Sequence, residues 1–210
     1  MADAQQQLKI EEFRQLHEHI RTFETALSTI FTVSLVACTT LLTAIVSLFF
    51  STYRADPSKI EVAVCYLFLI PAFLSVVTLA LMSSYKTAIY RNGYYIKVFF
   101  EEGKEVEGAR WHVNLAEYRK LAHGEHGNPA ALVLWALHGI SIAFFIHGLL
   151  LIRPRPWHYA MPLPLVGLMI YATVRFMGNR QSIEAAWHRV KDQIRGAPPP
   201  EPQSEKSVRP

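Results

Sequence analysis

Two histidines, His138 and His147, lie inside the third of four long apolar stretches of this chain. Ionisable residues at such depth in a membrane helix are rare and usually have a functional partner. Nine residues at about 100° each leave the two imidazoles on opposite faces of a helix, so they cannot easily share one metal ion. A haem would need a second axial histidine, and no other apolar stretch has one in its interior. The pattern favours a polar contact between helices, with Gly139 and Gly148 allowing close approach, and leaves a proton-linked or pore-lining role open.

The other histidines give weaker signals. His123 and His126 are three residues apart, but they have no cysteine or third ligand nearby, and the glycines and proline around them indicate a turn. The sequence has no Walker loop, no Gly-x-Ser-x-Gly and no His-Glu-x-x-His motif. The acidic residues that drive most ion-coupled transporters are missing from the apolar stretches. We therefore predict a protein that is not an enzyme and has no catalytic residue, metal site or cofactor.

Both cysteines, Cys38 and Cys65, also fall inside apolar stretches. A buried cysteine usually behaves as a small apolar residue, and a disulfide would require the two helices to touch at matching depth. The residues from Leu35 to Cys38 resemble a bacterial lipobox. The apolar stretch continues beyond them to Phe50, so we expect Cys38 to lie midway along a membrane span rather than to carry a lipid.

A segment rich in aromatic and charged residues follows the second apolar stretch. It reads YKTAIYRNGYYIKVFFEE over residues 85–102, and Trp111 follows it. This segment resembles one in uncharacterised small bacterial four-span membrane proteins, and is similar to small transmembrane effectors of anti-phage systems. The resemblance covers about 27 residues and implies that a cytoplasmic helical part controls a membrane part. It makes candidate functional residues of Arg91, Tyr95, Glu102 and Trp111.

The four apolar stretches are each long enough to cross a bilayer. None contains an acidic residue, and their one fixed charge is Arg175, close to an end. A helix needs about 20 mainly apolar residues to cross the hydrocarbon core, where backbone polar groups must pair within the helix. We therefore predict an all-α fold, an integral membrane four-helix bundle with helical cytoplasmic extensions. Its spans are predicted at residues 26–50, 62–83, 130–152 and 159–177.

The basic residues set the predicted topology. Of the 21 Lys and Arg residues, four lie in the two short connections on one side of the membrane: Arg54, Lys59, Arg153 and Arg155. The positive-inside rule therefore places both termini and the long middle connection in the cytoplasm. A net charge of +4 without a basic stripe is no sign of nucleic-acid binding. We expect a multi-pass protein of the bacterial inner (plasma) membrane that contacts the lipid bilayer and does not bind nucleic acid.

Apolar seams with helical spacing continue beyond the spans. Residues 1–25 have no Pro or Gly and are predicted to be a cytoplasmic amphipathic helix continuous with the first span. Their seam consists of Phe13, Leu16, Ile20, Phe23 and Leu27. Residues 84–129 are predicted to be a cytoplasmic helical hairpin, and residues 178–196 a last cytoplasmic helix. The proline-rich residues 197–210 have nothing to bury and are predicted to be disordered.

Such seams need a partner. Acidic and basic residues are mixed on the predicted cytoplasmic side, whereas helices that lie on a lipid surface usually have a strongly basic polar face. We therefore expect the cytoplasmic segments to pack together as a small bundle. Contacts between copies of the chain would satisfy the seams equally well, so a homo-oligomer or a partner in a membrane complex is expected.

Three functions remain open. The first is a non-enzymatic membrane protein that self-associates or binds a partner through its cytoplasmic helices and forms or gates a pore. Its lining candidates are His138, Ser141 and Thr40, and an intact membrane potential in every assembly state would exclude the pore. The second is a redox or cofactor-binding subunit that uses His138 or His147, which a colourless preparation would exclude. The third is a scaffold subunit of a membrane complex, which co-purification of a fixed partner in detergent would favour.

Overall fold

The computed structural model describes residues 2–55, 61–101, 129–178 and 180–196, and within these ranges it contains helices and no strand. The first half consists of α1 (Ala2–Ala55), α2 (Val62–Leu67), α3 (Leu69–Ile96) and the π-helix η2 (Lys97–Glu101). The second half consists of α5 (Pro129–Ile152), the 3-10 helix η3 (Pro156–Ala160), α6 (Leu163–Gly178) and α7 (Arg180–Gly196). The prediction of an all-helical chain is confirmed for these residues.

Four stretches of helix are long and apolar enough to cross a membrane: Gln6–Ala55, Val62–Glu101, Pro129–Ile152 and Pro156–Gly178. This confirms the prediction of four long apolar helices. The helix of the first stretch runs without a break into the charged N-terminal residues, and that of the second continues as far as the aromatic segment. The fourth begins with the 3-10 turn η3, where the local prolines prevent a regular helix start. Glu102, Trp111, the second arm of the predicted hairpin and the predicted tail lie outside the described residues.

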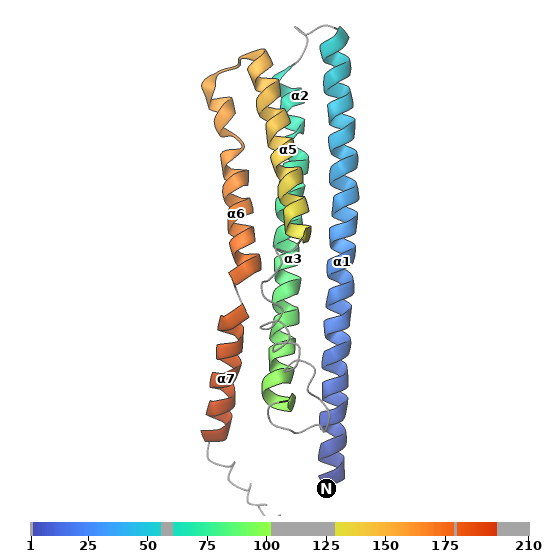
Figure 1. Ribbon diagram of the computed structural model, residues 1–210, viewed down its shortest axis with the longest axis vertical. Helices are drawn as coiled ribbons and strands as arrows, with labels where there is room; N and C mark the ends of the chain where they lie inside the picture. Colours follow the sequence, from blue (N-terminus) through green and yellow to red (C-terminus); the bar gives the residue numbers. More distant parts are fainter. Residues whose placement is uncertain (1, 56–60, 102–128, 179, 197–210) are drawn as a thin grey trace, which may run out of the picture.

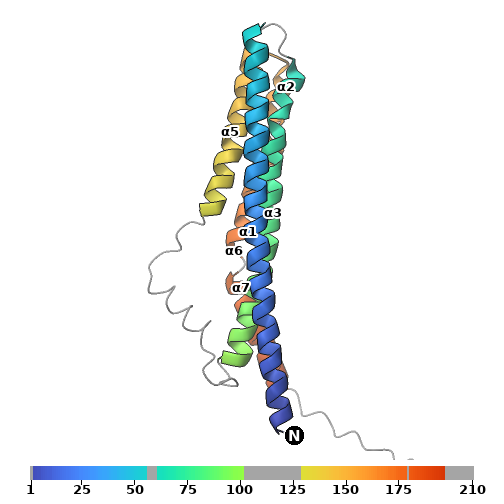
Figure 2. The same ribbon diagram turned by 90° about the vertical axis from the view of Figure 1, so that its right-hand side faces the viewer.

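Helix α3 is the central element of the molecule. It packs against α1, α5, α6 and α7. Figures 1 and 2 show α1 beside α3 along most of the length of α3. In Figure 1, α5 and α6 lie in the upper part of the view and α7 lies in the lower part. The apolar helices therefore gather at one end. The other end is built from the N-terminal half of α1, the C-terminal half of α3 with η2, and α7.

Pro71 accounts for the break between α2 and α3. Proline has no N–H to donate to the carbonyl four residues earlier, which here is that of Leu67, and its ring crowds that carbonyl. The helix is interrupted at the next residue, Phe68, whose N–H donates instead to the carbonyl of Cys65 at 3.1 Å. The ring of Phe68 is fully buried, lies edge-on to that of Phe49 and stacks on that of Phe144.

Two apolar clusters hold the upper half together. One lies near the α1–α2 connection and contains Ile45, Phe49, Cys65, Phe68, Phe145 and Leu149. The other lies further along α3 and contains Val76, Leu79, Met82, Leu134, Met169, Ala172 and Phe176. Each cluster takes residues from α3 or the preceding α2 and from α5, so both depend on α5 lying close to the central helix.

Gly148 lets α5 approach its neighbours. A Cβ atom at this position would lie 2.6 Å from Cys65 Sγ and 3.2 Å from Phe49 Cε2, both closer than side chains pack. A Cβ at Gly139 would meet nothing within 4 Å, since that residue lies on the exposed face of α5. The expectation of close approach was therefore right at Gly148 and wrong at Gly139.

Candidate functional site

His138 is buried where α5 meets α3. Its side chain is 1% exposed, and Nδ1 lies 3.1 Å from both the carbonyl oxygen of Ala72 and the hydroxyl oxygen of Ser75. The Ser75 hydroxyl itself donates to the Ala72 carbonyl at 2.7 Å. A carbonyl oxygen can only accept a hydrogen bond, so Nδ1 must carry the proton. We call His138, Ala72 and Ser75 the His138 cluster.

The second ring nitrogen of His138 has no such partner. Nε2 is buried and makes no hydrogen bond within the described part of the chain. With the proton on Nδ1, Nε2 of the neutral ring is an acceptor. No group of three His, Cys, Asp or Glu side chains among the described residues could hold a metal ion with it. What the His138 cluster offers chemically is therefore one enclosed acceptor between two helices, rather than a set of ligands.

Further contacts connect this region to the two remaining long helices. From α1, Cys38 Sγ lies 3.8 Å from the carbonyl oxygen of Pro71, the residue before Ala72. From α6, the Thr173 hydroxyl accepts a hydrogen bond of 2.9 Å from Nε1 of Trp135, whose ring lies edge-on to His138. Sequence reasoning named His138 but missed these partners. The sequence offered no signal for these carbonyls, because the carbonyl that Pro71 deprives of its helical donor is that of Leu67 rather than that of Pro71 or Ala72.

The other predicted residues of the apolar helices do not join this cluster. Ser141 is buried and donates to the carbonyl of Leu137 on its own helix at 2.8 Å. His147 and Thr40 lie on exposed faces of α5 and α1. Within one chain, the structure thus does not bring the predicted lining residues His138, Ser141 and Thr40 to a common surface.

A second candidate site lies at the opposite end of α3. The ring of Tyr95 is 5.0 Å from that of Trp187 on α7, 4.8 Å from Phe99 and 6.0 Å from Phe100, measured between centroids. The ring of Phe13 on α1 lies 5.7 Å from that of Phe100. We call these five aromatic residues the Tyr95 cluster. The Tyr95 hydroxyl also donates to Glu12 Oε1 on α1 at 2.8 Å. Tyr95 of α3 therefore contacts both α1 and α7.

Polar contacts fasten α7 to the same end of α3. Trp187 Nε1 donates to the carbonyl of Arg91 at 3.0 Å. Lys97 forms an ion pair with Glu184, and the Lys191 ammonium donates to the carbonyl of Val98. Lys97 and Val98 belong to the π-helix η2, and single π-helical turns inside helices are frequently found at functional sites.

The Tyr95 cluster uses the predicted residues unevenly. Tyr95 is at its centre. Arg91 contributes its backbone carbonyl, while its side chain is exposed. Trp187, which was not among the candidate residues predicted from the sequence, supplies one ring of the cluster. Glu101 was not among the candidate residues predicted from the sequence. Its side chain is only 2% exposed, which is unusual for a carboxylate.

No protein-family model, curated protein or solved structure matches this chain.

Proposed function

We propose that this chain is a multi-pass protein of the bacterial inner membrane, with both termini in the cytoplasm and no catalytic activity of its own. In this proposal the cytoplasmic helices bind a partner or a second copy, and the state of that contact is passed to the bundle in the membrane. The observation that carries the proposal is that α3 contacts His138 near one end and forms the Tyr95 cluster near the other.

The lengths and composition of the helices support the membrane part of the proposal. The best apolar windows of the four stretches have mean hydropathies of 2.2, 2.4, 1.9 and 1.5, and each stretch exceeds the roughly 20 residues that a span requires. The exposed surface of this region is also apolar. Large side chains such as Leu132, Leu150, Tyr171 and Val174 are more than half exposed, which suits lipid and would be costly in water.

The continuity of α3 supports the coupling part. Between Leu69 and Ile96 the helix has no break, and a helix transmits displacement along its axis because its backbone hydrogen bonds hold each turn to the next. Helix α7 touches α3 and η2 through aromatic rings, one ion pair and two hydrogen bonds to backbone. A partner that bound Trp187 or Glu184 would replace their contacts with α3 and η2. It would thereby release α7 and change the packing around α3. The resemblance of residues 85–111 to transmembrane effectors fits this arrangement.

A contact between copies through α1 is the second form of the proposal. Only 17% of the best apolar window of α1 is buried, against 44% for the stretch that contains α3. The exposed face includes Thr39, Thr40 and Thr43, which are small enough for close helix approach. The Thr43 hydroxyl donates to the carbonyl of Thr39 at 2.8 Å, so this face is compatible with lipid as well as with another helix.

Insertion and topology are tested first. Membranes of expressing cells are washed with carbonate and centrifuged, and the chain should stay in the pellet. In a variant with Cys38 and Cys65 replaced by Ala, single cysteines at Ala55 and Gln181 are then probed on intact spheroplasts with a maleimide that cannot cross the membrane. Labelling of Cys at position 55 but not at 181 is expected. The reverse pattern, or a chain in the supernatant, contradicts the proposal.

Coupling is tested with Trp187→Ala, and Trp157→Ala serves as control because Trp157 lies on η3, at the other end of the molecule. Cross-linking in membranes followed by mass spectrometry should show contacts of α7 or α1 with a partner or a second copy, altered by Trp187→Ala alone. A membrane-potential dye then separates the two outcomes of coupling. A potential that changes with the assembly state supports gating, and one that never changes removes the pore and leaves partner binding. Identical cross-links in all three proteins would overturn the proposal.

A further inference from the structure

A groove of about 680 Å³ runs along α1 where its charged part meets its apolar part. Its volume is in the range of sites that hold small molecules. Tyr85 of α3 forms one wall, and the rest is lined by Glu18, Arg21, Thr22, Thr25, Ala26, Thr29 and Ile30 of α1. Along the helix the lining changes from charged through hydroxyl-bearing to apolar, so the groove has the polarity gradient of an amphiphile.

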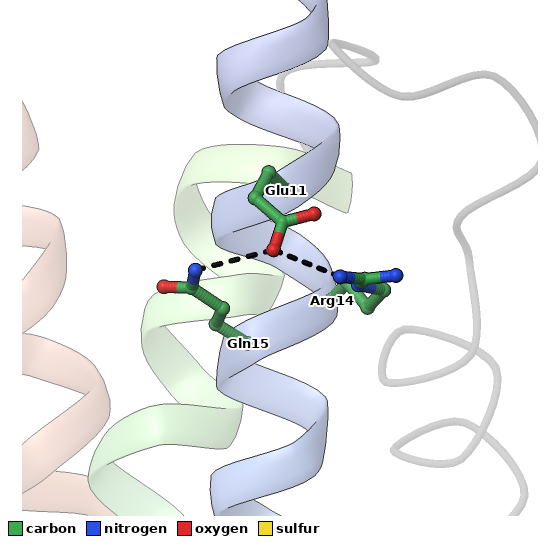
Figure 3. Close-up of polar contacts among 3 residues, drawn as sticks. All are labelled: Glu11, Arg14 and Gln15. Atoms are coloured by element: carbon green, nitrogen blue, oxygen red, sulfur yellow. Dashed lines mark hydrogen bonds and ion pairs between the residues drawn. The ribbon is translucent and has the colours of Figure 1, made fainter.

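The two charges of this groove lack partners in the described part of the chain. Neither the Glu18 carboxylate nor the Arg21 guanidinium makes an ion pair or side-chain hydrogen bond there, although they stand three residues apart on one helix. The same pair of residue types at the same spacing, Glu11 and Arg14, is joined at 3.0 Å, and Gln15 binds the same carboxylate oxygen (Figure 3). A spacing of three residues therefore allows an ion pair, yet Glu18 and Arg21 do not form one. Both charged groups remain available to a ligand.

The threonine hydroxyl groups of the groove can act toward a ligand only as hydrogen-bond acceptors. Thr22, Thr25 and Thr29 each donate to a carbonyl four residues earlier on α1, at 2.9 Å. Their oxygens are therefore left as acceptors. The Tyr85 ring lies edge-on to Phe23, and its hydroxyl makes no hydrogen bond within the described part of the chain. The groove thus offers two hydrogen-bond donors, the Arg21 guanidinium and the Tyr85 hydroxyl. It also offers acceptors, namely the Glu18 carboxylate and the threonine hydroxyl oxygens.

We propose that this groove binds a phospholipid with a phosphoethanolamine headgroup. The phosphate pairs with Arg21 in the forked geometry that guanidinium groups favour, and the Tyr85 hydroxyl donates to a phosphate or ester oxygen. Glu18, about 4.5 Å further along α1 from the apolar part, receives the ammonium group. One of its acyl chains lies along Ala26 and Ile30.

The order of groups along α1 is the reason for choosing this headgroup. In such a lipid the phosphate is next to the glycerol and the amine is beyond it, which is the order of Arg21 and Glu18 from the apolar end. A phosphoglycerol head would satisfy Arg21 but place no cation at Glu18. A phosphocholine head would place a cation there that has no N–H to donate. The inference rests on the proposed function, because it needs the start of the apolar part of α1 to lie at the cytoplasmic surface of a bilayer.

The experiment uses the full chain, purified in neutral detergent, stripped of lipid and mixed with one lipid of matched acyl chains carrying a phosphoethanolamine, phosphoglycerol or phosphocholine head. Native mass spectrometry counts the lipid that stays bound. The wild-type chain should retain phosphoethanolamine lipid best. Arg21→Gln should reduce its retention about tenfold, as expected for losing one charge-assisted contact, and Glu18→Gln should bring it to the phosphoglycerol level. Tyr85→Phe keeps the ring contact and should cause a smaller loss.

Arg14→Gln and Glu11→Gln are the matched controls and should bind lipid like the wild type. Equal retention of the three lipids by the wild-type chain overturns the inference, and so does an equal loss in Arg14→Gln. Both results leave a chain that is still recovered from the carbonate-washed membrane pellet, so the proposed function survives them. A chain absent from that pellet would instead remove the proposed function.

Discussion

Cys38 of α1 and His138 of α5 hydrogen-bond to consecutive carbonyl groups of α3. The thiol lies 3.8 Å from the oxygen of Pro71, and the imidazole lies 3.1 Å from the oxygen of Ala72. Two neighbouring helices are thus tied to one turn of the central helix, just after the break that Pro71 causes. Polar contacts of this kind set the register of packed helices, even though each contributes only about 0.6 kcal/mol on average in a membrane protein.

The burial of His138 predicts different effects for two substitutions. His138→Ala should lower the free energy of unfolding by about 2 kcal/mol, because it leaves a cavity as well as a lost hydrogen bond. His138→Leu should stay within about 1 kcal/mol of the wild type, because it fills the space and removes the orphaned Nε2 along with the bond. Unfolding followed by circular dichroism in detergent with added SDS measures both. Equal losses in the two variants would show that the hydrogen bond, rather than packing, dominates.

The two glycines of α5 predict opposite responses to the same change. Gly148→Ala should destabilise the protein by about 1–3 kcal/mol, since its new methyl group would overlap Cys65 Sγ. Gly139→Ala should be neutral or slightly stabilising, because it meets open space and favours the helix. The double variant with Cys65→Ala should recover part of the loss at position 148. Thermal unfolding in detergent is the measurement, and a Gly139→Ala loss as large as that of Gly148→Ala would refute the packing described for α5.

Trp187 predicts the local stability of α7. Trp187→Ala removes two ring contacts and the hydrogen bond to the Arg91 carbonyl, which together are worth about 2 kcal/mol. Amide exchange in α7 should therefore become about thirtyfold faster while that of α5 and α6 is unchanged. Hydrogen–deuterium exchange with mass spectrometry reports this. Trp157→Ala, at a ring that is 51% exposed, should leave α7 unaffected, and unchanged exchange in Trp187→Ala would contradict the role given to the Tyr95 cluster.

The ion pair between Lys97 and Glu184 predicts a measurable coupling energy. The two side chains are only 17% and 30% exposed, so a double-mutant cycle with alanine should give about 1 kcal/mol in low salt and less in high salt. Glu11 and Arg14 form the matched control, because they are 46% and 75% exposed and should couple by less than about 0.5 kcal/mol. The free energy of α7 opening from hydrogen exchange is the readout for the first pair. No coupling there would mean that α7 is held by its aromatic contacts and its hydrogen bonds to the carbonyls of Arg91 and Val98, without a contribution from this ion pair.

Local patterns in the sequence were sufficient to predict the four long apolar helices. Four apolar stretches predicted four long apolar helices, because the need to pair backbone groups within a segment depends on that segment alone. The absence of Pro and Gly from residues 1–25 predicted that α1 would run as one long helix from the N-terminal segment through the first span. The seam that contains Phe13 predicted which face of the N-terminal helix would be apolar, although it did not say which other helix would cover that face.

The contacts between helices needed the tertiary structure. His138 and His147 have the same residue type, the same helix and a following glycine, yet one is buried against Ala72 and the other is exposed. The difference arises solely from which side of α5 faces α3, and that choice depends on the packing of Phe145, Leu149 and their neighbours on other helices. Periodicity places residues on faces of a helix, whereas only the joint packing of several helices decides which face is covered.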